Sequence, residues 1–194
     1  PFEGSFAAIL ADGRIVLWGE FKGSIPIPDQ MKAVQHIQAT KRAVATILAD
    51  GSVRTWGTPD SGGDSFCVQH LLQNVTQIQS TEHAFAAVLA DGSVVTWGNP
   101  RFGGDSSAVQ GQLLKVQKIQ AARGPMIGGA FAAILADGKV VTWGDPKYGG
   151  DSSEVQDHLI DVQDIHSTSS SFAARLANGR VVTWGSKDFG GDSS

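Results

Sequence analysis

The 194-residue chain carries 15 Lys and Arg against 19 Asp and Glu, with 41% hydrophobic and 18% charged residues and a formal net charge of −4. This composition is typical of a globular protein and argues against a disordered chain. An acidic chain has no excess of cations to displace counterions from phosphates, so direct nucleic-acid binding is not expected. The single cysteine, Cys67, excludes an intrachain disulfide and a cysteine-rich zinc site, and we expect a packed, unreactive thiol.

The hydropathy of the chain gives no sign of a membrane span. No apolar stretch approaches the roughly 20 residues that a membrane-spanning helix requires. No leader with a basic and an apolar region is visible at the N-terminus. We therefore expect a soluble, intracellular protein, in a compartment that the sequence does not name.

One pattern is written five times along the chain, in segments that span 6–19, 44–57, 85–98, 131–144 and 172–185. Each segment ends in Trp-Gly, and together they contain all five tryptophans, Trp18, Trp56, Trp97, Trp143 and Trp184. The tryptophans are 38, 41, 46 and 41 residues apart, which indicates a unit of 41 residues with a contraction at 20–29 and an insertion at 123–129. A period of this length is typical of propellers and solenoids.

Each segment has an Asp-Gly or Asn-Gly pair between two apolar runs. Such a pair is the strongest short-range hairpin signal, and it favours a two-residue type I′ turn with positive φ at both positions. Folding the third copy about Asp91-Gly92 places Phe85 opposite Gly98 and Ala86 opposite Trp97. The turn glycines, which we predict to be structural residues of the repeat, are Gly13, Gly51, Gly92, Gly138 and Gly179.

Both faces of the hairpins are apolar, whereas a sheet with one wet face would alternate apolar and polar residues. Each sheet must therefore be covered on both sides, as in the radially stacked blades of a propeller. A third strand is predicted at 116–121, with counterparts that begin at Val34, Val75 and Val162. The segment after each Trp-Gly, such as 102–113, begins as a turn and continues either as a short capped helix or as an edge strand.

The run V-x-x-I-x-A-x-x-x-A-x-A-x-L-A-D-G-x-V-x-x-W-G resembles the repeat of the regulator of chromosome condensation, and the resemblance covers essentially the whole chain. The family's Gly-Gln-Leu-Gly turn reads Gly-Gly-Asp-Ser here. The resemblance implies an all-β, seven-bladed propeller, in a family that includes nucleotide-exchange factors, a plant ultraviolet-B receptor and domains of giant ubiquitin ligases. It predicts that 1–194 is one repeat array with four to five blades, truncated at both ends from a propeller of about seven blades.

The residues with chemical potential are better explained by structure than by catalysis. The resembling receptor senses light through tryptophans in Gly-Trp-Arg-His-Thr, and the corresponding positions here are Glu3, Lys41, Glu82, Gly128 and Ser169, so the five tryptophans are expected to lie in the core. The recurrent Gly-Gly-Asp-Ser-Ser is expected to be a turn and helix cap rather than a hydrolase or calcium site. The five histidines form no short metal-ligand pattern, and we expect them in solvent. We predict no enzyme activity, no cofactor, no metal and no small-molecule ligand.

Variation between the copies is concentrated in the loop between the third strand and the hairpin. Because packing fixes the scaffold positions, such loops are free to carry recognition, although for any single residue a solvated turn is the favoured interpretation. The sequence therefore predicts a protein-protein interaction scaffold that binds another protein or a multi-subunit complex, with a guanine-nucleotide exchange factor for a small GTPase and an architectural subunit of a large assembly as the alternatives. The predicted partner-binding residues are Lys41, Arg42, Glu82, His83, Arg123 and Met126.

Overall fold

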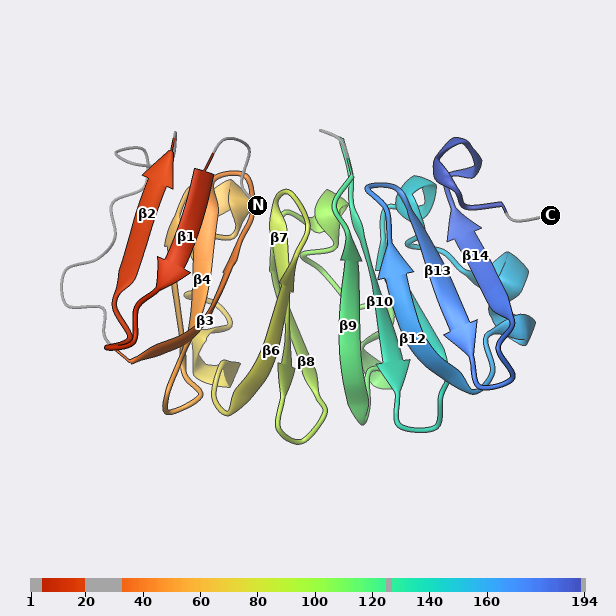
Figure 1. The fold of residues 1–194 in the computed structure, drawn as a ribbon, viewed down its shortest axis with the longest axis horizontal. Coiled ribbons are helices and arrows are strands. Elements are labelled where there is room, and N and C mark those ends of the chain that lie inside the picture. The colour runs from red at the N-terminus through yellow and green to blue at the C-terminus, as the bar shows by residue number, and fades with distance from the viewer. Residues whose placement is uncertain (1–4, 20–32, 125–126, 193–194) are drawn as a thin grey trace.

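The computed structural model describes residues 5–19, 33–124 and 127–192. Within these ranges the chain forms five antiparallel sheets that stand side by side in sequence order (Figure 1). The first sheet has two described strands, and each of the other four has three. The predicted all-β propeller of tandem repeats is therefore confirmed, and we number the sheets as blades 1 to 5.

Blades 2 to 5 each contain an inner, a middle and an outer strand in chain order, and blade 1 contains β1 (Ser5–Ile9) and β2 (Ile15–Gly19). The inner strands are β3 (Val34–Ala39), β6 (Val75–Ser80), β9 (Val116–Ala122) and β12 (Val162–Ser167). The middle strands are β4 (Ala43–Leu48), β7 (Ala84–Leu89), β10 (Ala130–Leu135) and β13 (Ser171–Leu176). The outer strands are β5 (Val53–Gly57), β8 (Val94–Gly98), β11 (Val140–Gly144) and β14 (Val181–Gly185). The inner strands, which the sequence predicted as the third strand of each unit, contact one another from blade to blade.

The hairpin turns differ from the predicted type I′ turns. In blade 3, Leu89 N donates to Ser93 O at 2.9 Å, and Gly92 N donates to Leu89 O at 2.9 Å. Only the glycine of the Asp91-Gly92 pair has a positive φ, of 80°. A type I′ turn needs positive φ at both positions, so the connection is instead a three-residue loop that ends in a left-handed glycine.

The longer loop shifts the strand register by one residue from the prediction. Phe85 lies opposite Trp97, and Ala84 rather than Phe85 lies opposite Gly98. The rings of Phe85 and Trp97 stack with their centroids 5.1 Å apart and their planes at 21°. The prediction that an alanine faces the indole was therefore wrong, and an aromatic cross-strand pair takes its place in blades 3, 4 and 5.

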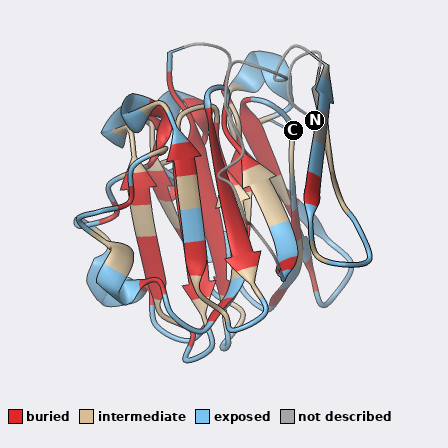
Figure 2. Ribbon diagram, turned by 90° about the vertical axis from the view of Figure 1, so that its left-hand side faces the viewer, coloured by how far each residue is buried: buried red, intermediate tan, exposed pale blue. Residues whose placement is uncertain are grey.

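Alternate residues of each middle strand belong to two different cores, as the period of a strand requires. Along β7, Phe85 and Ala87 pack with residues of blade 2, whereas Ala86 and Val88 pack with residues of blade 4. Buried residues accordingly run along the strands, and exposed residues gather in the connections at both ends (Figure 2). The expectation that each sheet is covered on both faces is confirmed for the interior blades.

Short 3₁₀ helices follow each outer strand, and they settle the alternative between a capped helix and an edge strand. The first set directly follows the outer strands as η1 (Pro59–Ser61), η3 (Pro100–Phe102), η5 (Pro146–Tyr148) and η7 (Lys187–Phe189). The second set follows Gly-Gly-Asp-Ser as η2 (Gln69–Leu71), η4 (Gln110–Gln112) and η6 (Ser153–His158). The predicted helix cap is absent, because η2, η4 and η6 have no side-chain cap hydrogen bond; Asp105 Oδ1 instead accepts a hydrogen bond from Ser107 N at 2.9 Å in a turn that precedes η4.

A chain of side-chain hydrogen bonds anchors this segment to the outer strand. In blade 3, Ser106 Oγ lies 3.0 Å from Thr96 Oγ1 and 2.9 Å from Gln110 Oε1. Gln110 Nε2 donates in turn to Val94 O at 3.0 Å. Blades 2 and 4 repeat the Thr-Ser-Gln chain. The glutamine thereby gives a partner to a main-chain carbonyl of an edge strand that has no neighbouring strand on that side.

Blades 3, 4 and 5 each also hold the glycine turn of the blade before with a tryptophan hydrogen bond. Trp97 Nε1 donates to Gly62 O at 3.0 Å, and Trp143 and Trp184 make the same bond to Gly103 and Gly149. A Cβ on Gly62 would lie 2.6 Å from the Phe85 ring, so only glycine admits the aromatic pair. Four of the five tryptophans are buried in the core as predicted, whereas the prediction was wrong for Trp18, which is 46% exposed at the end of the array. Trp56 Nε1 is buried without a hydrogen-bond partner among the described residues.

Cys67 departs from its prediction, because it is exposed rather than packed. Val68 and the fully buried Leu72 supply the core contacts of this segment, and the two residues before Val68 point to solvent. Phe66, which occupies a position held by serine in blades 3 and 4, is 84% exposed. In the part of the chain that the structure describes, no helix has the length and apolar character needed to cross a membrane.

Candidate protein-binding face

The loops between inner and middle strands lie side by side at one end of the array, which we call the loop face. Main-chain hydrogen bonds join these loops from blade to blade: Lys41 N donates to Glu82 O at 2.7 Å, Glu82 N to Arg123 O at 3.3 Å, and Gly124 N to Ser169 O at 2.6 Å. The hairpin turns lie at the opposite end of the same strands. The structure therefore brings together the loops that the sequence predicted.

In blades 2 and 3 a threonine holds the shape of the loop, and the residue after it differs between the blades. Thr40 Oγ1 donates to Ser61 O at 2.9 Å and accepts a hydrogen bond from Ala43 N at 3.0 Å. Thr81 Oγ1 donates in the same way to Phe102 O at 2.8 Å. Counted from the first residue of each inner strand rather than back from the hairpin turn, the equivalent positions in blades 2 to 5 are Lys41, Glu82, Arg123 and Ser169.

The predicted residues of blade 2 are the most accessible. Lys41 and Arg42 are exposed, and Glu82 in the next blade is partly exposed. Met126 lies outside the described residues, so its prediction is not placed. Two cations and one carboxylate are thus presented on the loop face by neighbouring blades.

Arg123 lies deeper and ties three blades together. Its Nη2 donates to Ala39 O at 3.0 Å and to Ser80 Oγ at 3.2 Å, and Ser80 Oγ donates to Ala39 O at 2.8 Å. Burial lowers the pKa of Arg123, and the nearby carboxylate of Glu82 acts against this. A guanidinium nevertheless keeps its proton at neutral pH, so the site holds a permanent positive charge.

His83 is partly buried between two blades, whereas the other four histidines are exposed as predicted. Its Nδ1 lies 2.8 Å from Ser61 Oγ, and its ring meets Phe102 edge to face with the centroids 4.5 Å apart. Burial lowers the pKa of His83, because desolvation disfavours the imidazolium form. The side chain therefore contributes to packing beneath the loop face as well as to its surface.

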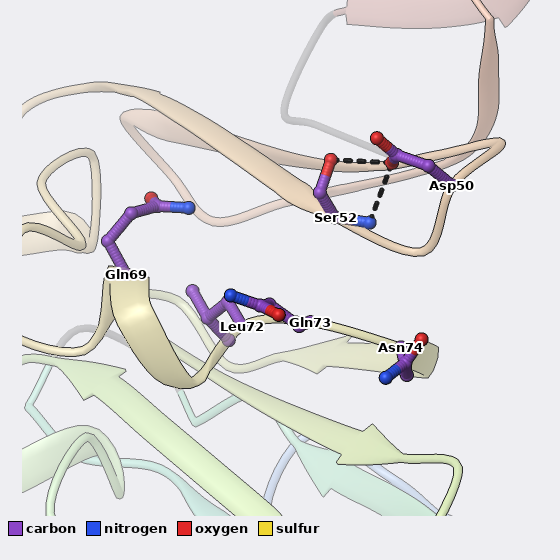
Figure 3. Close-up of a pocket in the computed structure, with 6 residues that line it drawn as sticks. All are labelled: Asp50, Ser52, Gln69, Leu72, Gln73 and Asn74. Atoms are coloured by element: carbon purple, nitrogen blue, oxygen red, sulfur yellow. Dashed lines mark hydrogen bonds between the residues drawn. The ribbon is translucent and has the colours of Figure 1, made fainter.

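The opposite end of the array contains a polar pocket of about 390 Å³ in blade 2 (Figure 3). Its wall includes Asp50, whose Oδ1 accepts hydrogen bonds from Ser52 N at 2.9 Å and Ser52 Oγ at 2.6 Å. It also includes Gln69, which is bonded to Ser65 and to Val53 O. Blade 3 repeats both bonding patterns, which indicates that this pocket follows from the repeat.

Metal chemistry finds no support in the described part of the chain. There, no three His, Cys, Asp or Glu side chains lie close enough to hold one ion. His166 Nε2 pairs with Asp164 Oδ2 at 3.1 Å, and Asp164 Oδ1 accepts from Lys118 Nζ at 2.6 Å. The carboxylate of Asp164 therefore joins β12 to β9 through Lys118, and it also contacts His166 on its own strand.

The sheets and their order define the class of protein as a β-propeller. No family model matches the sequence, and no curated protein matches it significantly. The fold does match solved propellers of the type named for the regulator of chromosome condensation, so the resemblance inferred from the sequence is confirmed at the level of the fold.

Three of these structures illustrate the match. Prp20p from Saccharomyces cerevisiae has a TM-score of 0.60 and 15% identity, over 94% of this chain and 56% of that chain. The ectodomain of the receptor kinase CR4 from Physcomitrella patens has a TM-score of 0.63 and 14% identity, over 93% and 50% of the two chains. Human WBSCR16 has a TM-score of 0.53 and 20% identity, over 92% and 52%. The chain spans about half the length of each of these proteins.

The sequence prediction missed the polar residues of the inner strands that meet the loop face. Gln79, Gln120 and Ser167 line a cavity together with Arg123. The signal was present, because the inner strands carry polar residues between buried ones, as in the burial pattern of β6. That these residues line one cavity depends on how the blades pack against one another, and the sequence of a single strand does not contain this information.

Proposed function

We propose that the chain is a non-catalytic protein-binding scaffold whose partner docks on the loop face. The observation that carries this proposal is a set of adjacent loops that main-chain hydrogen bonds join from blade to blade and whose side chains differ. Lys41, Glu82, Arg123 and Ser169 hold equivalent positions in four blades, and hydrogen bonds between the loops keep them in a fixed order. A rigid scaffold with variable loops is the usual design of a recognition surface.

Proteins with the same fold give support of a general kind. The solved structure of Prp20p is described together with its binding to Gsp1p and histones, and yeast RCC1 (Prp20) has been solved bound to Kap60. In those proteins, propellers of this type bind other proteins. We infer the same mode of action for this chain, with a partner of its own.

The test is affinity capture from a cell extract with the full-length protein, followed by identification of the retained proteins. The variant Lys41→Ala/Arg42→Ala removes the two exposed cations of the loop face. The matched control, Lys139→Ala/Arg180→Ala, removes two exposed cations from the hairpin turns at the other end. We expect a partner that the wild type and the control retain and the loop-face variant loses.

Equal retention by both double variants would contradict the proposal. Loss of the partner by the control variant alone would show that the binding surface is at the hairpin end. A guanine-nucleotide exchange assay with a small GTPase tests the exchange-factor alternative on the same preparations.

A second candidate, an architectural subunit, is favoured by the exposed apolar residues of the end blades. Trp18 and Val16 in blade 1 are 46% and 42% exposed, and Val181 and Phe189 at blade 5 are 55% and 54% exposed. The equivalent residues of the interior blades are buried, apart from Arg54, which holds the place of Val16 in blade 2. Light scattering on the 194-residue chain tests this candidate, because uncovered blade faces favour aggregation or assembly, whereas a folded monomer favours an autonomous binding domain.

A further inference from the structure

A cavity of about 420 Å³ opens where the inner strands reach the loop face. Gln79 of β6, Gln120 of β9 and Ser167 of β12 line it, together with Arg123 and Ser169 of the loops. Blades 3, 4 and 5 therefore each contribute residues to this one cavity. The pocket at the hairpin end differs, because its hydrogen-bonding pattern recurs in blade 3.

The walls of this cavity consist of amides, hydroxyls and one cation. Gln120 Nε2 donates to Ser167 Oγ at 3.1 Å, and Ser167 Oγ donates to Ala121 O at 2.7 Å, which fixes both side chains. The charged pair of the same inner strands, Lys118 and Asp164, is joined at 2.6 Å. Arg123 is therefore the charge of the cavity wall, and the other side chains named above are hydrogen-bonding groups without charge.

We propose that this cavity receives the carboxylate of an Asp or Glu side chain from the protein that docks on the loop face. A carboxylate only accepts hydrogen bonds, and the side-chain amides of Gln79 and Gln120 beside a guanidinium can supply donors to it. The cavity volume of about 420 Å³ admits one such side chain. The inference rests on the proposed function, since it names the chemistry of the partner at that face.

The carboxylate of Glu82 would compete with the incoming carboxylate for Arg123, so a substitution of Glu82 gives a second test with the opposite expected effect. Its carboxylate already acts electrostatically on Arg123 from the neighbouring loop. An incoming carboxylate must share the guanidinium with Glu82 and meets its repulsion. Removing this charge should therefore strengthen binding, while removing the charge of Arg123 should abolish it.

The experiment is an NMR titration of the full-length protein with acetyl-Gly-Glu-Gly-amide, with acetyl-Gly-Gln-Gly-amide as the neutral control probe. We expect saturable shifts of the Gln79 and Gln120 side-chain amides with the acidic probe alone. Arg123→Gln should remove these shifts, and Glu82→Gln should tighten binding by at least twofold. The affinity should fall as salt is added, because the attraction is between charges.

Arg123 also bridges three blades, so its loss could disturb the fold. Ser169→Asp avoids this problem, because it adds a carboxylate to the wall and leaves the hydrogen bond from Gly124 N to the main chain of residue 169 in place. This variant should weaken the acidic probe at least fivefold while its backbone spectrum stays that of the wild type.

Equal shifts with both probes would overturn the inference, as would an acidic probe that binds Ser169→Asp and wild type alike. If these tests fail while capture of a partner still depends on Lys41 and Arg42, the proposed function stands and the cavity does not serve it. If capture also fails, both are lost.

Discussion

Gly103 lies where blade 4 packs against the turn that follows blade 3, and there is no room for a side chain at this position. It has φ of 86°, and a Cβ there would lie 2.6 Å from the ring of Phe131 in the next blade. We expect Gly103→Ala to destabilise the protein by about 2–4 kcal/mol, from the left-handed backbone and from overpacking. Gly111→Ala is the control, since nothing lies within 4 Å of its Cβ, and its effect should stay within ~0.5 kcal/mol. Urea unfolding of both variants measures the difference, and equal effects would contradict the packing argument.

His83 should make stability depend on pH just below neutrality. Its pKa is lowered by burial, so the folded state resists protonation. The stability from neutral His83 is complete above the ordinary pKa of about 6.5 and is lost as pH falls toward the lower value of the folded state. We expect the melting temperature to fall between pH 7.5 and 5.5 by less in His83→Gln than in the wild type.

Thermal unfolding followed by circular dichroism at the two pH values measures this difference. His70→Gln, which removes an exposed imidazole, is the control. An unchanged pH dependence in His83→Gln would show that burial of this ring is not the cause.

At the scale of the element, the Thr-Ser-Gln chain should hold each turn segment on its outer strand. Ser106 is buried, and its hydroxyl lies between Thr96 and Gln110. Ser106→Ala leaves their polar groups without this partner, and we expect a loss of about 1–3 kcal/mol. Ser107→Ala makes the same change at the exposed next residue and should cost less than ~0.5 kcal/mol. Chemical denaturation separates the two, and a similar cost for both would contradict the role of the chain.

The strands could be predicted from the sequence and their register could not. Five copies of an apolar hairpin with Trp-Gly indicated the blades, because burial on both faces leaves a pattern in every copy. The turn type was wrong, because the Asp91-Gly92 pair is compatible with two loop lengths and the stacking of Phe85 on Trp97 selects between them. A one-residue choice of this kind depends on which side chains meet across the hairpin, which the turn residues alone do not decide.

The candidate site was predictable in the same limited sense. Variation between copies pointed to Lys41, Glu82 and Arg123, and the structure places them in adjacent loops. The half-buried position of Arg123 and its cavity were not predictable, since Ala39 and Ser80, which hold its guanidinium, lie 84 and 43 residues away.

At the scale of the whole molecule, burial falls off toward the end of the array. Val140 and Val181 hold the same place in blades 4 and 5, yet they are 2% and 55% exposed. We expect Val140→Thr to cost about 1–3 kcal/mol, because it buries a hydroxyl, and Val181→Thr less than ~0.5 kcal/mol in this chain. Thermal unfolding measures both. A large cost for Val181→Thr in the full-length protein would reveal a further surface packed on blade 5.

The bond from Trp97 to Gly62 has a consequence for synthesis on the ribosome. The glycine turn of one blade is locked by an indole made 35 residues later. At the usual rate of translation, a full 41-residue repeat takes roughly 2–8 s to appear. For that interval the newest blade has an uncovered apolar face, so a nascent chain of this kind offers chaperones a binding site that moves forward by one repeat at a time.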